Sequence, residues 1–208
     1  MGSLGEWVEY VYKRKIGHEK WKQHRKVTEE LWQRIRREIA NLDLDYQKVR
    51  LYQDGLPNSG TEERIVRELA EKGSENHRLL AEFMDKGAKV TGTEPPELLL
   101  EEYETIRGML SSHSHEDVAG LYAERRRALL LERDRYIAQR ISDTLATGET
   151  GLIFLGMLHS VEDHLSPHIR LSALGGTRPI LVQAGIASPG EAARPEDPGE
   201  VLPPQEAV

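Results

Sequence analysis

The sequence predicts an α/β protein: an open, mainly parallel sheet of few strands, with helices on both faces and a helix-rich N-terminus. Three short segments, 48–52, 88–92 and 151–155, concentrate apolar, β-branched and aromatic residues, which is typical of strands. Longer segments with an apolar residue at every third or fourth position lie between them and are typical of helices. Because strands that alternate with helices pair in parallel through right-handed crossovers, the three strands are expected to share one sheet.

The first predicted helix covers 19–41, within a charged helical N-terminal segment, 1–45. An apolar stripe marks this helix, and its residues recur at every fourth position: Val27, Leu31, Ile35 and Ile39. After the first strand, Ser59 or Thr61 is suited to begin the next helix, and Gly73 to end it. Ser74 then begins a second, shorter helix.

Two longer helices are predicted over 97–110, which follows a proline turn, and over 118–147, which precedes a glycine. The segment 151–155 is apolar without alternation and is bounded by glycines, which suits a central strand covered on both faces. We expect a turn and a short helix or loop over 157–174. A last edge strand is expected at 179–182.

Length and composition indicate one domain with a tail. The chain has 208 residues and a mass of 23.6 kDa, which suits a single domain over 1–183. Gly, Pro, Ala and Glu dominate 184–208, so this tail is expected to be disordered. Cys is absent, which excludes disulfides, thiolate metal sites and Cys nucleophiles. The sequence has no phosphate-binding glycine loop and no nucleophile elbow around a serine.

Charge and hydropathy limit the partners. The net charge is −7, and residues 1–40 carry ten Lys or Arg against six Glu, so the remainder is strongly acidic. An acidic body argues against nucleic acid as a partner, because that needs a basic face. No apolar run approaches the roughly 20 residues of a membrane-spanning helix, and the first residues lack a secretory pattern. We therefore expect a cytoplasmic protein with no membrane and no nucleic-acid partner.

Three polar pairs directly follow predicted strands: Asp54-Gly55, Thr93-Glu94 and His159-Ser160. In open α/β sheets, ligands bind beyond the carboxyl ends of the strands. The three pairs are therefore expected to converge on one crevice.

Each residue of this crevice has a functional and a structural interpretation. His159 suits a general base or a metal ligand, since the ordinary pKa of histidine lies near neutrality, or it hydrogen-bonds the next loop. Glu94 suits a metal ligand or a base, or it stabilises a helix N-terminus. Asp54 suits substrate binding, or it shapes a turn before Gly55. Arg133, on the long helix, suits a carboxylate or phosphate, or it is solvated like most of its neighbours.

The order of these motifs resembles a known superfamily. The C-terminal half of the TraB/Tiki and erythromycin-esterase/haem-binding-lipoprotein superfamily is similar in its order of elements. The elements here are an Arg-bearing helix (132–141), a glycine, an apolar strand and Gly156-Met157-Leu158-His159. Thr91-Gly92-Thr93-Glu94 resembles the acidic strand-end element of the same superfamily. The resemblance covers about residues 45–172. It implies that the chain is part of an uncharacterised bacterial branch of this superfamily. Members carry a second His element after an N-terminal first strand, which 1–45 lacks, so Met1 is expected to be an internal start of an N-terminally truncated chain.

The resemblance implies two functional hypotheses. If the chain is catalytic, it is a metal-assisted hydrolase of a small molecule or peptide, in which His159 and Glu94 hold a divalent metal ion or activate water. Arg133 would then steady an oxyanion or a substrate carboxylate, and Asp54 would bind substrate. The alternative is a non-enzymatic ligand-binding module, of the haem type, or a regulatory module, with an incomplete site. A missing first strand would leave a sheet edge open, so a homo-oligomer is expected.

Overall fold

The computed structural model describes residues 17–111, 116–174 and 177–184. Five strands form one sheet in the order β2-β1-β3-β5-β4. β1, β2 and β3 are mutually parallel, β5 runs antiparallel to β3, and β4 runs antiparallel to β5. The strands are β1 (Val49–Pro57), β2 (Lys89–Glu94), β3 (Thr150–Phe154), β4 (Ile169–Leu174) and β5 (Thr177–Ala184). The predicted fold class, an open and mainly parallel α/β sheet, is confirmed.

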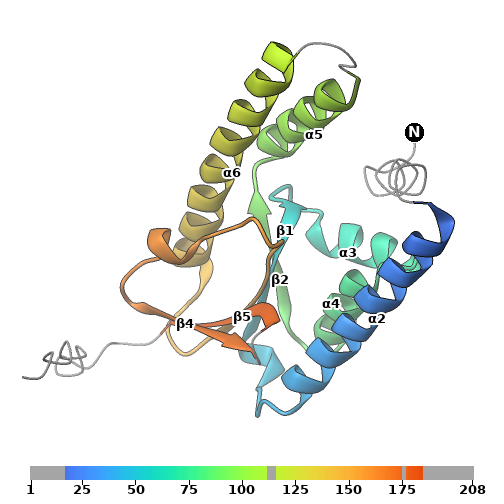
Figure 1. Cartoon of the computed structure of the whole chain (residues 1–208). Coiled ribbons are helices and arrows are strands. Elements are labelled where there is room, and N and C mark those ends of the chain that lie inside the picture. Colours follow the sequence, from blue (N-terminus) through green and yellow to red (C-terminus); the bar gives the residue numbers. More distant parts are fainter. Residues whose placement is uncertain (1–16, 112–115, 175–176, 185–208) are drawn as a thin grey trace, which may run out of the picture.

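Five α-helices accompany the sheet in the described residues (Figure 1). They are α2 (His18–Ala40), α3 (Glu62–Glu71), α4 (Glu75–Asp85), α5 (Pro96–Ser111) and α6 (Glu116–Thr144). Short 3₁₀ turns, η1 (Tyr46–Lys48) and η2 (Glu162–His164), precede β1 and β4. Each predicted helix is present within a few residues of its expected bounds. Among the described residues, no helix is both long and apolar enough to cross a membrane.

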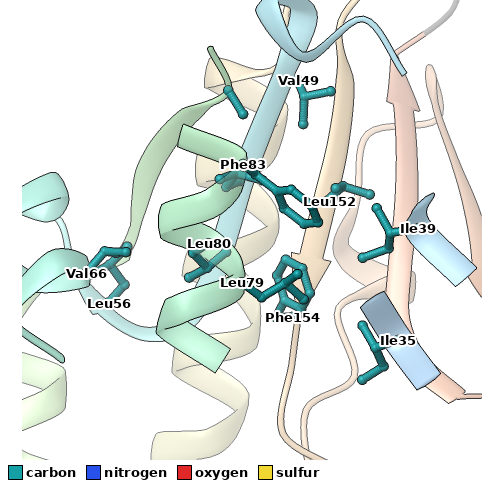
Figure 2. Close-up of a cluster of buried hydrophobic side chains, with 12 residues drawn as sticks. Ile35, Ile39, Val49, Leu56, Val66, Leu79, Leu80, Phe83, Leu152 and Phe154 are labelled. Carbon is teal, nitrogen blue, oxygen red and sulfur yellow. The ribbon is translucent and has the colours of Figure 1, made fainter. Parts of the chain in front are cut away.

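The strands alternate their side chains between two apolar clusters, one on each face of the sheet. Leu51 and Phe154 pack with buried residues of α2, α3 and α4. Figure 2 shows Phe154 among them. Tyr52 follows Leu51 on β1, and Ile153 precedes Phe154 on β3. Both pack against α6, on the other face of the sheet. The central strands are therefore covered on both faces, as their continuous apolar sequence predicts.

The sequence prediction for 157–174 was wrong in its second half, where the chain forms β4. Half-buried Ile169 and Leu171 alternate there with exposed Arg170 and Ser172, which is the pattern of a strand with one face on the core. The predicted edge strand, 179–182, is part of β5. It is an inner strand, because β4 pairs along its other side.

Two sequence predictions concern the N-terminal segment and the C-terminal tail. Residues 1–16 of the N-terminal segment and 185–208 of the predicted tail lie outside the described residues. For Ala184, the first residue of the predicted tail, the prediction of disorder was wrong, because Ala184 ends β5 and pairs with Ile169 of β4.

Candidate functional site

The end of β1 departs from regular pairing next to β2. Gln53 pairs with Gly92, but the next pair in register joins Pro57 to Glu94. Three residues of β1, 54–56, therefore lie opposite the single residue Thr93. A bulge of this kind redirects side chains at a sheet end, and here it presents Asp54 and the Gly55 amide beside Glu94.

Small residues and one hydroxyl hold this bulge. The Thr93 hydroxyl donates to the carbonyl of Gln53 at 2.5 Å and lies 3.3 Å from that of Leu56. Gly55 adopts a positive φ of 73°, which favours glycine. A Cβ on Gly92 would lie 2.5 Å from the Asn58 Cα, so no larger residue fits there. The geometry of the bulge is thus encoded in β2 as well as in β1.

His159 ends a tight turn after β3 and is buried, with 5% of its surface exposed. Its amide donates to the Gly156 carbonyl at 3.1 Å. Its Nδ1 lies 2.6 Å from Oδ1 of Asp134 on α6, and the other oxygen of Asp134 accepts from the Ser160 amide at 3.0 Å. Asp134 therefore fixes both the histidine ring and the loop that carries it.

Asp54 lies on the other side of the histidine ring. Its Oδ2 is 3.5 Å from His159 Nε2 and accepts the Gly156 amide at 2.7 Å. Burial raises the pKa of Asp54 above its ordinary value, although the Gly156 amide, His159 and Arg133 oppose the rise. A buried aspartate, a histidine and a second aspartate thus lie in one row.

Glu94 and Arg133 form a buried ion pair beside this row. Glu94 is fully buried, and Arg133 donates to both of its oxygens, through Nε to Oε2 and through Nη2 to Oε1 at 3.0 Å. The Gly55 amide also donates to Glu94 Oε1, at 2.6 Å. Arg133 Nη1 lies 2.6 Å from Glu102 of α5. Burial tends to lower the pKa of Arg133, but the hydrogen bond and charge of Glu94 together with Glu102 raise it overall, so the guanidinium stays charged.

All four residues predicted from the sequence lie at the same end of the sheet. The Asp54-Gly55 turn contacts Glu94 on one side and His159 on the other, and Arg133 contacts Glu94. Asp54, Arg133 and His159 also line one cavity of about 380 Å³, together with Glu102, Arg126 and Met157.

The donor set does not fit a divalent ion held by Glu94 and His159. Both Glu94 oxygens contact the cationic Arg133, and His159 Nδ1 is bonded to Asp134. A cation at Glu94 would be repelled by the adjacent guanidinium. Within the described parts of the chain, no group of three or more His, Asp or Glu is placed to hold a metal ion.

Sequence reasoning missed three polar residues of the site. The charged sequence around Asp134 predicts a solvated position, yet Asp134 shares one helical face with Leu130, Ile137 and Ile141, and that spacing indicates a buried one. Gln53 donates to Asp54 Oδ1 at 2.5 Å, and Asn76 of α4 donates to Gln53 at 2.7 Å. Nothing in the local sequence connects Asn76 to the strand ends.

Fold and site together define an α/β protein with a cluster of paired ionisable side chains at the carboxyl ends of its parallel strands. Comparisons of the chain with models of known protein families, with curated proteins and with solved structures gave no match.

Proposed function

We propose that this chain is a hydrolase, related to the TraB/Tiki and erythromycin-esterase group, in which His159 activates the attacking water. The observation that carries the proposal is the row Asp134–His159–Asp54, in which His159 and Asp54 line a cavity. A carboxylate bonded to one imidazole nitrogen orients the ring and stabilises its protonated form. The same row is what general acid–base catalysis requires.

In this proposal each residue has a role in ester or amide hydrolysis. Asp134 accepts a hydrogen bond from the Nδ1–H of His159, so that Nε2 takes a proton from water while the water oxygen attacks the carbonyl carbon. Asp54, whose pKa burial raises, holds a proton for the departing alcohol or amine. Arg133 places positive charge beside the cavity, where the oxyanion develops. The proton on His159 Nε2 then passes to Asp54, 3.5 Å away, which restores both residues. The products are one acid and one alcohol or amine, and water supplies both the hydroxyl and the proton.

Glu94 acts indirectly in this proposal. It is fully buried and holds both Arg133 and the Gly55 amide. It therefore positions the guanidinium and the Asp54 turn rather than contacting substrate. The metal-assisted form of the hypothesis is not carried forward, because both carboxylate oxygens of Glu94 accept hydrogen bonds from Arg133.

Acid release from a panel of esters and peptides, followed at constant pH, tests the proposal. The purified chain should hydrolyse at least one class, and His159→Asn should lower kcat/KM about 100-fold or more. His168→Asn is the matched control, since His168 is exposed and lies in the loop before β4, and it should leave the rate unchanged. Equal rates for the native chain and His159→Asn on every substrate would reject the hydrolase and favour the ligand-binding alternative.

A further inference from the structure

A second hollow lies next to the cavity described above. It has a volume of about 510 Å³ and is lined by α2, by the end of β3 and by the polar residues Gln53, Asp54 and Asn76. The first cavity is lined instead by residues of α5 and α6. We call the second one the α2 hollow. A volume of this size is in the ordinary range of small-molecule sites.

The wall that α2 and β3 contribute to the α2 hollow is apolar. Ile35 and Phe154 are buried at 1% and 2% exposure and belong to the same side of the sheet (Figure 2). The Trp32 ring lies against Phe154, with ring centres 6.1 Å apart. Leu31 and Met157 are exposed at 39% and 90%, so they form an apolar rim open to a ligand.

The polar residues of the α2 hollow are connected by hydrogen bonds to Asp54, one of the proposed reacting residues. Asn76 donates to Gln53, and Gln53 donates to Asp54, so this wall ends at the carboxylate that faces His159. The remaining lining offers a ligand apolar contact. A molecule in the α2 hollow would therefore place its polar end at Asp54.

The two spaces share three lining residues, Asp54, Gly156 and Met157. Gly156 lies at the junction, where a Cβ would be 3.0 Å from Asp54 Oδ2 and 3.7 Å from His159 Cδ2. The lack of a side chain at Gly156 leaves room beside both reacting residues. One elongated ligand can thus extend from the α2 hollow past Asp54 and His159 into the charged cavity.

We infer that the α2 hollow binds the apolar acyl chain of the substrate, so that the substrate class is an ester of a medium-length or aromatic acid. This inference rests on the proposed hydrolase function. The charged cavity with Glu102, Arg126 and Arg133 takes the polar, alcohol-derived part. Specificity then depends on α2, an element that lies outside the segment resembling the superfamily.

A series of p-nitrophenyl esters from acetate to decanoate tests the assignment. The native chain should prefer octanoate or decanoate over acetate by at least about tenfold in kcat/KM. Leu31→Arg, which puts a charge on the apolar rim, should remove that preference by lowering kcat/KM for octanoate and decanoate more than for acetate. Val27→Arg is the matched control, because Val27 lies one turn earlier on α2, is 65% exposed and does not line the hollow. Thermal melts of both variants establish that they fold alike.

Calorimetric titration of 1-octanol into the His159→Asn variant separates this inference from the proposed function. Leu31→Arg and Val27→Arg are each added to the His159→Asn variant. If Leu31→Arg abolishes octanol binding and Val27→Arg preserves it, the result supports an apolar site in the α2 hollow, even if no ester is hydrolysed. Hydrolysis without chain-length preference and without octanol binding overturns the inference and leaves the hydrolase intact. Octanol binding that Leu31→Arg does not affect places the apolar ligand elsewhere and also overturns it.

Discussion

Asp134 is the residue on which the orientation of His159 depends. One of its oxygens contacts the ring at 2.6 Å and the other accepts the amide of Ser160. Replacing a carboxylate by an amide at such a position preserves the shape but favours the wrong imidazole tautomer. We expect Asp134→Asn to lower kcat/KM about 100-fold or more while the chain still folds.

Steady-state kinetics and a thermal melt of the same preparation measure this effect. Asp143→Asn, an exposed aspartate on the same helix, is the control and should keep full activity. A rate of Asp134→Asn close to that of the native chain would show that the Asp134 contact is structural only.

The raised pKa of Asp54 is expected to lower the free energy of unfolding as the pH rises. Its pKa is raised in the folded state, chiefly by burial, with Glu94 adding to the rise. The folded state then binds the proton more tightly than the unfolded state, so this residue destabilises the fold as the pH rises through the interval above its ordinary value of 3.8. Asp54→Asn removes that dependence.

Urea unfolding from acidic to neutral pH tests this expectation. The free energy of unfolding of the native chain, minus that of Asp54→Asn, should fall as pH rises above the ordinary aspartate value. Asp85→Asn, at an exposed position on α4, supplies the comparison. A difference that rises with pH would mean that the Gly156 hydrogen bond and the charges of His159 and Arg133 outweigh the burial of Asp54.

Among secondary-structure elements, the bulge of β1 connects fold and site. Gly92 permits it, because any Cβ would meet the backbone of Asn58 at 2.5 Å and Pro57 at 2.6 Å. Gly92→Ala should therefore cost about 1–3 kcal/mol of stability and also lower activity, since the Asp54 turn must shift. Gly120→Ala on α6, where a Cβ meets nothing within 4 Å, should change stability by less than about 1 kcal/mol.

Chemical denaturation and ester hydrolysis of both variants check this prediction together. If Gly92→Ala proved as stable and active as Gly120→Ala, the close crossing of the two backbones would not constrain the site.

The helices and the three parallel strands could be predicted because each carries its own local pattern. Periodic apolar residues mark α2, and a glycine-bounded apolar run marks β3. The strand-end rule then located Asp54, Glu94 and His159 without any knowledge of pairing. The sequence did not predict β4, because its alternation of apolar and polar residues is short. Only Arg170 and Ser172 interrupt the apolar residues there.

Contacts between distant elements could not be predicted in the same way. The Gln53–Asn76 bond joins residues 23 positions apart, and the Asp134–His159 bond joins residues 25 apart. The bulge depends on Gly92 and Thr93, which lie on the neighbouring strand. Such features follow from register and packing, which a single sequence does not state.

At the scale of the whole molecule, the arrangement of the sheet changes the expectation of self-association. The sequence predicted few strands and an open edge, and from these a homo-oligomer. In the structure β5 pairs with β3, so β2 and β4 are the edges of the sheet that the described residues form. Arg140 of α6 donates to the Gly92 carbonyl on β2 at 3.2 Å, and β4 carries exposed Arg170. Charged side chains at strand edges oppose pairing with another chain.

We therefore expect the chain to be monomeric, with light scattering after size exclusion giving a mass near 23.6 kDa. Arg140→Ala removes the side chain that covers Gly92 and should increase concentration-dependent association. Arg64→Ala is the control, because Arg64 lies exposed on α3 and pairs only with its helix neighbour Glu68 in the described structure. A stable dimer of the native chain that Arg140→Ala leaves unchanged would mean that association uses a surface other than the β2 edge.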